Sequence, residues 1–435
     1  MKSPGRKNVG MNSLRKVEGK DTMKKQLLIG CVFAAMAGLA GAGEFPSFSQ
    51  PRAITSGPKD HLFASYYAIN SWSADGRYAT VLETDLKNVL PTEKDVAVLG
   101  VVDAQDNNRF IPLTETRCWN FQEATMAHWL GTAPQTQFIF NDLVDGKFAS
   151  VVYDMATKTR RVVGLPVSAV SADGKWAVSI NYARLRLTRP DYGYGGNGQD
   201  ARVGTVWPED DGLWLVNLET GEAKLIVTIA SVRDRMPQVK DAKALAYFCH
   251  TVFSRDGSQI FWLARTVENL EGQKVVRKWE TTSFTCNRDG SEVRRSFPDG
   301  WGGSHFNWLN DGRLMVTARY KNSVWSHVLF TPGRDDYVRL GRGVLDFDGH
   351  GVFSDDGKWM ATDTYPDKLG ERKLMIMRTA DQAILPLGGF LVPELYMEQY
   401  SRCDLHPRWR SDGKMLGFNS AHEGSRQVYV MDVEY

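Results

Sequence analysis

One short phrase recurs along the chain and limits its fold more strongly than any other feature. It consists of an apolar strand, an Asp-Gly turn and a second apolar strand, and a degenerate seventh copy runs from residue 129 to residue 140. Asp-Gly between two strands favours a hairpin, because glycine adopts positive φ readily. Repetition at a regular spacing indicates a repeat architecture. The six clear copies place the turn at residues 75–76, 173–174, 256–257, 311–312, 356–357 and 412–413.

A second set of apolar strands alternates with these hairpins. Six of the seven are followed by a polar turn and one more strand, whereas the seventh, at 427–433, reaches the C-terminus. We therefore predict an all-β, seven-bladed β-propeller. A strand from the segment 48–56 should complete the last blade and close the ring, since an open sheet edge invites aggregation. The repeated phrase is similar to that of TolB-type propellers.

The N-terminal residues predict an export signal. Lys24 and Lys25 precede an apolar run over 27–42, which ends in small residues and is shorter than the ~20 residues of a membrane-spanning helix. This pattern is typical of a secretory signal peptide, and we expect cleavage near Ala42. Residues 1–42 are then a signal peptide with an upstream extension. Residues 43–435 form the propeller domain, which we expect to be secreted or periplasmic.

The charge of the chain argues against a body that binds nucleic acid. Eight Lys or Arg and two acidic residues give the first 42 residues a net charge of +6, whereas the whole chain has +2, which leaves −4 for residues 43–435. No further segment is apolar enough to span a membrane, and we expect a monomer. Four cysteines follow the signal peptide, and the sequence does not say whether they pair. They are at 118, 249, 286 and 403.

Four of the eight histidines share one register of the repeat. His250, His305, His350 and His406 each stand six residues before the Asp of an Asp-Gly turn. Equal register on a strand means equal direction, so the four imidazoles should converge at one mouth of the central channel. Converging imidazoles favour a transition metal, with zinc as the first expectation and manganese as the alternative. Fewer than four of them should ligate it directly, since zinc usually takes four ligands in all.

Three other side chains are candidates for the same region. Cys403, three residues before His406, would favour zinc as a thiolate ligand, or would be a small buried residue or a disulfide partner. His422 would lie in a loop behind the metal or against substrate. The side chain of His128 would point into the same channel, two residues further along its strand than His250 on the strand of its own blade. A neutral imidazole there is a candidate general base or an ordinary packed residue.

A long loop over 188–211, between the second and third strands of the third blade, should cover the channel. It contains Tyr192 and Tyr194. Loops of this length are usually functional or disordered. Arginines in and before it would bind carboxylate or sulfate, because the guanidinium pairs with such groups in a bidentate manner. The alternative is a surface loop with solvated arginines. These arginines are Arg184, Arg186, Arg189 and Arg202.

Two parts of the chain carry a resemblance to known propeller lyases. The stretches 403–409 and 420–424, which contain Cys403, His406 and His422, resemble the oligogalacturonate-lyase-related propellers, as do 348–350 and 363–366, which contain Asp348 and Asp363. The stretch 119–194 is similar to the propeller ulvan lyases. The resemblance implies β-elimination on an anionic polysaccharide that contains uronic acid, with ulvan as the first expectation.

The resemblance also implies roles for single residues. His128 and Tyr192, or Tyr194 in its place, would be the proton-transfer residues. Arg202 would neutralise the uronate carboxylate, and a structural zinc would lie nearby. Phe148 stands in the region where some of these lyases carry a further histidine, so the division between base and acid is left open. In oligogalacturonate lyases the channel metal binds the carboxylate instead. That alternative would move catalysis to the histidine cluster, with Arg408 beside it.

Two other classes of function stay open. A non-catalytic binding propeller of the TolB type would need neither the aligned histidines nor a cluster of His, Tyr and Arg. A hydrolase would need a pair of carboxylates facing the channel, and only Asp404 and Glu423, both in predicted turns, are candidates.

Overall fold

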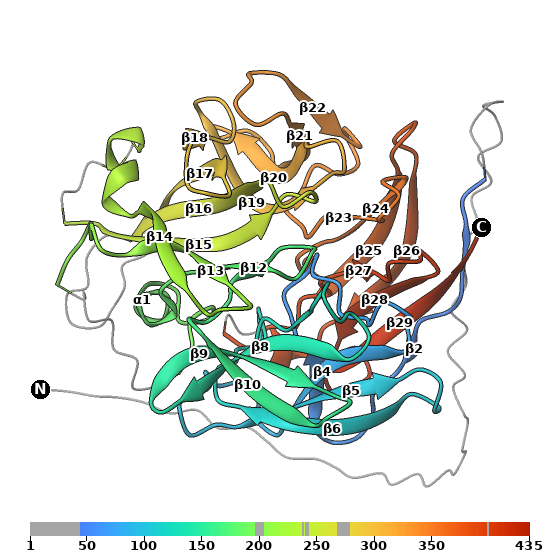
Figure 1. Ribbon diagram of the computed structural model, residues 1–435. Coiled ribbons are helices and arrows are strands. Elements are labelled where there is room, and N and C mark those ends of the chain that lie inside the picture. Colours follow the sequence, from blue (N-terminus) through green and yellow to red (C-terminus); the bar gives the residue numbers. More distant parts are fainter. Residues whose placement is uncertain (1–43, 196–203, 237–238, 240–242, 268–278, 398–399) are drawn as a thin grey trace, which may run out of the picture. The chain divides into compact units, whose positions relative to one another are not determined.

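Seven antiparallel sheets make up the part of the chain that the structure describes, arranged as the blades of a β-propeller. The computed structural model describes residues 44–195, 204–236, 239, 243–267, 279–397 and 400–435. In Figure 1 the blades follow the sequence colours from blue to red around the ring. The predicted seven-bladed, all-β fold is confirmed. The expected signal peptide lies outside the described residues.

Within each blade the strands run from the innermost to the outermost in sequence order. Blades 1 to 3 comprise β3 (Asp60–Phe63), β4 (Tyr78–Thr84), β5 (Ala97–Asp103) and β6 (Arg109–Thr116); β7 (His128–Trp129), β8 (Gln137–Val144), β9 (Lys147–Asp154) and β10 (Thr159–Gly164); and β11 (Ala169–Val170), β12 (Trp176–Ser179), β13 (Gly212–Asn217) and β14 (Ala223–Thr228). Blades 4 to 6 comprise β15 (Leu245–Phe253), β16 (Gln259–Val267), β17 (Trp279–Asn287) and β18 (Arg294–Arg295); β19 (Trp301–Trp308), β20 (Leu314–Tyr320), β21 (Ser326–Phe330) and β22 (Tyr337–Leu340); and β23 (Val352–Phe353), β24 (Trp359–Asp363), β25 (Glu371–Arg378) and β26 (Ile384–Leu391). Blade 7 comprises β27 (Arg408–Trp409), β28 (Met415–Ser420) and β29 (Gln427–Glu434), completed by β1 (Ser47–Phe48) and β2 (Arg52–Ala53).

Side-chain hydrogen bonds explain why the repeated Ser-x-Asp-Gly phrase forms each turn. In blade 1, Ser73 Oγ donates to Asp75 Oδ1 over 2.6 Å, and the same oxygen accepts from the backbone N of Arg77 at 3.1 Å. Gly76 follows with φ of 70°, a left-handed conformation that glycine adopts without steric cost. The same Ser–Asp hydrogen bond recurs in blades 3, 4 and 6.

The N-terminal strands close the ring at the last blade. Phe48 pairs with Val433 and Ala53 pairs with Tyr429, both antiparallel on β29. Figure 1 shows β2 beside β29. Ile54, which follows β2, is 6% exposed and belongs to the core. The predicted closure is confirmed, and it covers an edge of β29 that would otherwise be open.

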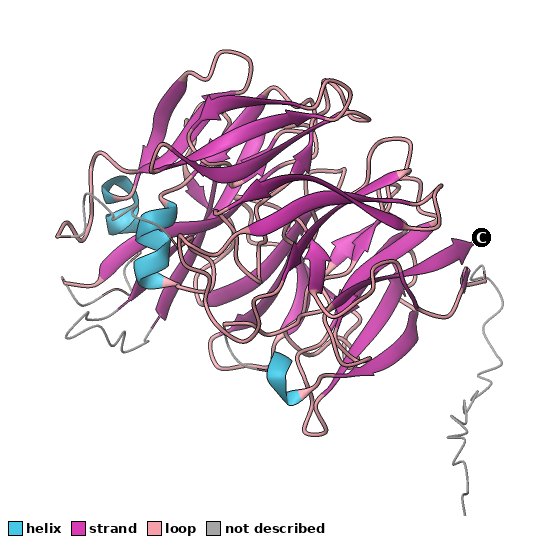
Figure 2. Cartoon of the chain, turned by 90° about the horizontal axis from the view of Figure 1, so that it is seen from below, coloured by secondary structure: helices cyan, strands magenta, loops and turns pink. Residues whose placement is uncertain are grey.

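The connection between β12 and β13 begins as a short helix, which the sequence analysis did not predict. Helix α1 spans Tyr182–Thr188, and its N-cap Asn181 accepts a hydrogen bond from the backbone N of Arg184. Figure 2 shows how few helices accompany the strands. Two further 3-10 helices of the described chain are η1 (Ala230–Arg235) and η3 (Glu394–Tyr396).

Two findings concern membrane spans and disulfides. In the described part of the chain, no helix combines the length and the apolar content needed to cross a bilayer. Cys118, Cys249, Cys286 and Cys403 are all buried as free thiols.

A loop within the first blade enters the central channel. Thr80 accepts a hydrogen bond from the backbone N of Ala64 at 3.1 Å and donates its own backbone N–H to Ser71 O at 2.8 Å. The residues between Ala64 and Ser71 therefore leave the inner edge of the blade and return to it. Tyr66 and Tyr67 lie on this excursion, both buried, with ring centroids 4.6 Å apart. We call this segment the tyrosine loop.

Removal of the N-terminal strands should destabilise the propeller. A chain that begins at Gly57 lacks β1 and β2, whereas a control chain that begins at Glu44 keeps both. We expect the shorter chain to unfold at a lower temperature and to aggregate, since lost burial of Ile54 alone costs about 2 kcal/mol. Thermal unfolding by circular dichroism, with light scattering, compares the two chains. Equal melting temperatures would contradict the closing role of these strands.

Candidate functional site

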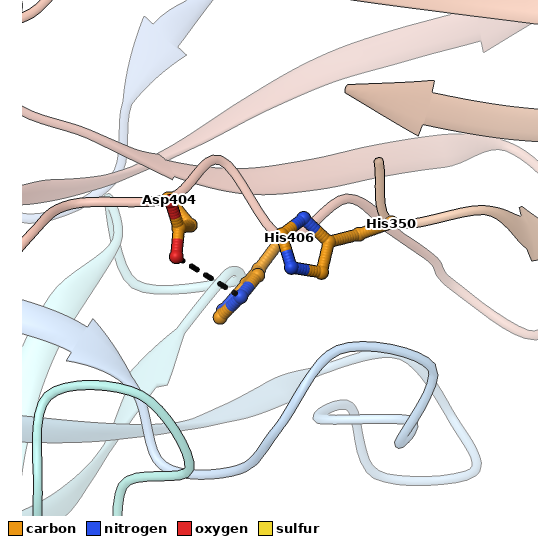
Figure 3. A group of neighbouring side chains, drawn as sticks. All are labelled: His350, Asp404 and His406. Atoms are coloured by element: carbon orange, nitrogen blue, oxygen red, sulfur yellow. Dashed lines mark ion pairs between the residues drawn. The ribbon is translucent and has the colours of Figure 1, made fainter. Parts of the chain in front are cut away.

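Three side chains at one mouth of the channel converge closely enough to hold a metal ion. The ligand atoms of His350, Asp404 and His406 all lie within 4.8 Å of one another, and all three residues are buried. Figure 3 shows Asp404 facing His406, with His350 beside them. The two imidazole centroids are 4.3 Å apart. His350 precedes β23 and the other two precede β27, so two neighbouring blades build this metal set.

A buried carboxylate, Asp363, orients both histidines. Its Oδ1 accepts from the backbone N and from Nδ1 of His350, each at 2.8 Å, and its Oδ2 accepts from the backbone N of His406 at 3.0 Å. Because Nδ1 of His350 donates to Asp363, its Nε2 keeps the lone pair that a metal needs. His406 has φ of 48°, a strained conformation for a residue other than glycine, which the contact to Asp363 helps to hold.

The free atoms of the metal set fit a divalent cation. Nε2 of His350 and Nε2 of His406 are buried and have no hydrogen-bond partner among the residues described. Burial lowers the pKa of His406 well below its usual value, so its imidazole is neutral. Burial opposes ionisation of Asp404, but Arg402 and Arg372, each with a nitrogen 2.7 Å from a carboxylate oxygen, hold its pKa well below the usual range. Two imidazole nitrogens and one carboxylate suit a divalent transition metal.

Of the other two histidines in the predicted cluster, His305 lies beside the metal set and His250 does not. The ring of His305 packs on His350 with centroids 4.0 Å apart. His250 lies against the opposite side of the tyrosine loop, where Tyr66 stacks on it at 5.5 Å. The tyrosine loop therefore separates His250 from His406, since Tyr66 also contacts the His406 ring edge-on at 5.2 Å.

Cys403 is not brought to the metal set. Its side chain packs with Val392, Tyr396 and Ala421, and burial raises the pKa of the thiol to about 11. Asp404, the next residue, takes the place in the cluster that a cysteine was expected to fill. Successive side chains in an extended segment point to opposite sides, which explains why Asp404 reaches the channel and Cys403 does not.

A cavity of about 590 Å³ adjoins the metal set, and we call it the upper cavity. Among the described residues, its lining includes His305 and five cationic side chains but only two carboxyl groups, those of Glu280 and Asp348. This balance favours an anionic ligand. Arg265 is 8% exposed, its Nε has no hydrogen-bond partner, and it forms no ion pair within the described chain. The five cations are Arg189, Arg265, Arg319, Lys321 and Arg402.

The imidazole of His305 is set up as a base by an ionised carboxylate. Asp348 Oδ1 lies 3.0 Å from Nδ1 of His305 and accepts from Thr317 Oγ1 at 2.8 Å. Burial opposes ionisation of Asp348, but His305 and these hydrogen bonds keep its pKa below the usual value. Burial, together with neighbouring His350, lowers the pKa of His305. Nδ1–H therefore donates to Asp348, and Nε2 retains a basic lone pair.

A second imidazole–carboxyl pair in the same wall is neutral. Oε1 of Glu123 lies 3.1 Å from Nδ1 of His250, and both residues are buried. Burial raises the pKa of Glu123 to about 8; Arg189 opposes this shift and Asp191 adds to it. Burial also lowers the pKa of His250 well below its usual value. The carboxyl group of Glu123 is therefore protonated, and it donates a hydrogen bond to Nδ1 of His250.

The insertion after β12 contributes two of its predicted residues to the upper cavity. Arg189 and Tyr192 line it, and the guanidinium of Arg189 lies 4.6 Å over the Tyr192 ring while it pairs with Asp191. Burial raises the pKa of Tyr192, so its hydroxyl stays protonated, and Arg402 donates to that hydroxyl at 3.4 Å. Arg202 lies outside the described residues.

Three other predicted substrate-binding residues of this insertion have structural contacts instead. Arg184 is buried and donates to backbone carbonyls, including Ala246 O at 2.6 Å. Arg186 donates to Pro91 O at 3.0 Å. Tyr194 stacks on Tyr182 with centroids 4.3 Å apart. Arg184 and Arg186 both stand on helix α1, which turns Arg184 into the core.

The structure does not bring His128 to Tyr192, which corrects the expectation that they share one site. His128 and Arg408 line a separate cavity of about 440 Å³ near the Asp-Gly turns, which we call the lower cavity. His128 stands two residues further along its strand than the register of His250. Two residues of a strand span about 6–7 Å, which places His128 on the far side of the tyrosine loop. Nδ1 of His128 donates to Met126 O at 2.7 Å, and burial lowers its pKa to about 4. His422 packs on aromatic rings away from the residues that line either cavity.

Four residues of the site were not identified as part of it in the sequence. Asp404 carried a usable signal, because a carboxylate two residues before His406 can face the same way. Arg265 carried a weaker one, a charge within the apolar strand β16. Asp363 belonged to a stretch that resembles the oligogalacturonate lyases but had no assigned role, and Glu123 carried no signal. They stand 13 and 127 residues from the histidines that they contact.

Comparison with known proteins supports the fold. No family model matches the sequence, and no curated protein matches it significantly. An oligogalacturonate lyase in complex with manganese is 16% identical, with a TM-score of 0.62 over 89% of this chain and 96% of that one. The oligogalacturonate lyase of Vibrio parahaemolyticus is 14% identical, with a TM-score of 0.60 over 89% and 97%. At these identities the similarity establishes a shared propeller fold; resemblance to ulvan lyases stays a prediction.

Substitutions should separate metal ligands from their neighbours. His406→Ala and Asp404→Asn should each lower the affinity for Zn²⁺ and Mn²⁺ at least tenfold, because each removes one of three convergent donors. Cys403→Ser is the matched control and should keep the wild-type metal content. Elemental analysis after dialysis against each metal gives the metal-to-protein ratio. Loss of metal from Cys403→Ser alone would contradict this ligand set.

The protonated Glu123 should make stability depend on pH. Its pKa is raised from 4.5 to about 8 in the folded protein, so the folded state holds the proton more tightly and stability falls as pH rises through this interval. The depressed pKa of His250 acts in the opposite direction, but only below its ordinary value of 6.5. Between pH 6.5 and 8, wild type should therefore lose up to about 2 kcal/mol relative to Glu123→Gln. Urea unfolding of both proteins across this range measures the difference, and parallel curves would contradict a protonated Glu123.

Proposed function

We propose that this chain is a metal-dependent lyase that cleaves a uronate-containing polysaccharide by β-elimination. One observation carries the proposal: the upper cavity brings together His305 and Arg265, a cation with no ion pair among the described residues, and it lies beside the metal set. The reaction removes a weakly acidic proton from C5, next to a carboxylate. It therefore requires positive charge near the carboxylate and a base for the proton. Two structural neighbours named oligogalacturonate lyases, one of them with manganese, support the same class.

The residues divide the reaction as follows. Arg265 pairs with the uronate carboxylate and draws charge from it, which acidifies the proton at C5. Nε2 of His305 accepts that proton while Asp348 holds the imidazole by Nδ1. The C4–O bond breaks as the C4=C5 double bond forms. Tyr192, protonated in its buried position, donates its hydroxyl proton to the leaving oxygen.

The metal set would add positive charge beside these groups. His350, Asp404 and His406 would hold a divalent cation, and when bound it would act as a Lewis acid toward the carboxylate. We expect zinc or manganese. Arg402 lines the cavity and also pairs with Asp404, which keeps this carboxylate ionised. The same guanidinium therefore contacts both the metal set and the cavity.

Ulvan is the substrate that we expect first, because residues 119–194 are similar to the propeller ulvan lyases. An oligogalacturonate is the alternative, favoured by the position of the metal set beside the cavity. We further propose export after cleavage near Ala42, which would give the enzyme access to extracellular polysaccharide.

The activity should appear as ultraviolet absorbance of an unsaturated product. Purified protein loaded with Zn²⁺ or Mn²⁺ is incubated with ulvan, pectate and oligogalacturonate. Relative to wild type, His305→Asn should lower the rate at least 100-fold through loss of the base, and Arg265→Met should do so at least tenfold. Arg334→Met is the control, since Arg334 pairs with Asp336 in an exposed turn.

Two results would contradict the proposal. No absorbance from any of the uronans would exclude the lyase and favour a binding propeller. Full activity of His305→Asn would remove the assignment of the base while leaving the lyase class intact.

A further inference from the structure

The lower cavity, at the opposite mouth of the channel, has the composition of a second ligand site. Its volume of about 440 Å³ falls within the roughly 300–1,000 Å³ of small-molecule pockets. Indole rings from four blades line it: Trp72, Trp129, Trp308 and Trp409. The tyrosine loop separates it from the upper cavity, because Ala68, Ile69 and Asn70 of that loop form part of its lining.

A buried cation without a counter-ion stands in this lining. Arg408 is 1% exposed, and its hydrogen bonds go to neutral acceptors, the carbonyl and hydroxyl oxygens of Ser65 and the hydroxyl of Ser71. Its Nε has no partner, and it forms no ion pair with any residue that the structure describes. Arg255, the other cation of the lining, is already neutralised by Asp355 at 2.9 Å.

A buried charge without a partner is costly, because desolvation is not offset by an opposite charge. The upper cavity cannot supply the missing anion, since the tyrosine loop lies between. The lining itself supplies a single carboxylate, Asp355, which is bound to Arg255. An anion from solution that enters the lower cavity would therefore offset the charge of Arg408.

His128 adds a second requirement on the ligand. Its Nδ1 donates to the carbonyl of Met126, and its pKa near 4 keeps the ring neutral at physiological pH. Nε2 therefore presents a lone pair, which accepts a hydrogen bond and cannot donate one. No side chain of the described chain occupies this acceptor. A hydroxyl group on the ligand matches it, whereas a bare inorganic anion does not.

We propose that the lower cavity binds a small hydroxylated carboxylate, such as a single sugar acid. Its carboxylate pairs with Arg408, a hydroxyl donates to Nε2 of His128, and its ring packs against the indole faces. This site is independent of the proposed lyase chemistry, which uses the residues of the upper cavity alone.

Isothermal titration calorimetry with D-glucuronate tests the site. D-glucose, which lacks the carboxylate, and acetate, which lacks the hydroxylated ring, are the comparison ligands. The titrations are made in an Arg265→Met background, so that the principal unpaired cation of the upper cavity is absent. We expect saturable binding of glucuronate and at least tenfold weaker binding of glucose and of acetate.

Variants of the lower cavity assign the binding to it. Arg408→Met should weaken glucuronate binding at least tenfold, and His128→Phe, which keeps an aromatic ring, should weaken it several-fold. Arg255→Met is the matched control, because that charge is already paired, and it should bind glucuronate within twofold of the parent. Melting temperatures establish that each variant is folded. If Arg408→Met does not fold, the affinity of His128→Phe for glucuronate tests the site instead.

Three outcomes would overturn the proposal. They are no binding of glucuronate by the parent protein, undiminished binding by folded Arg408→Met and His128→Phe, and acetate binding as tight as that of glucuronate. None of them bears on the absorbance assay, so failure here leaves the lyase proposal standing.

Discussion

Two tyrosines that fill the central channel are the constraint on which the rest of the structure depends. Tyr66 stacks on His250 and meets His406 edge-on, while Tyr67 lies against His350 at 5.0 Å. The hydroxyl of Tyr67 accepts from the backbone N of Phe306 and donates to its carbonyl, which fixes the loop to blade 5. One excursion of one blade thus orders the histidines and divides the channel into two cavities of different chemistry.

Buried carboxyl groups then set the hydrogen bonding of each histidine. Asp363 orients His350 and His406, Asp348 holds Nδ1 of His305, and protonated Glu123 leaves His250 neutral. The four imidazoles are equivalent in the repeat, yet their neighbours differ. Burial makes these differences large, because a low-dielectric setting strengthens each charge and each hydrogen bond.

Sequence reasoning failed where a side chain's direction or reach depended on several blades at once. The register of the histidines correctly brought them to one mouth of the channel, but it could not tell that a loop of blade 1 would separate His250 from the others. His128 was predicted on the right face of its strand, yet the same loop places it in the lower cavity. Arg184 was assigned to substrate because helix α1, which turns it inward, has no strong signal in the sequence. Tyr194 follows this helix and packs on its first residue, Tyr182.

The sequence by itself determined the all-β architecture, the number of blades and the closure by the N-terminus. These features follow from two local patterns, the Asp-Gly hairpin and the alternation of strands. Both patterns recur in each blade, so the fold can be predicted even where one copy is degenerate. Only the tertiary structure decided that Asp404 replaces Cys403 in the metal set, that Arg265 has no counter-ion among the residues described, and that the channel has two cavities. Those outcomes depend on contacts between residues far apart in the chain, and on which charges remain unpaired once all blades are in place.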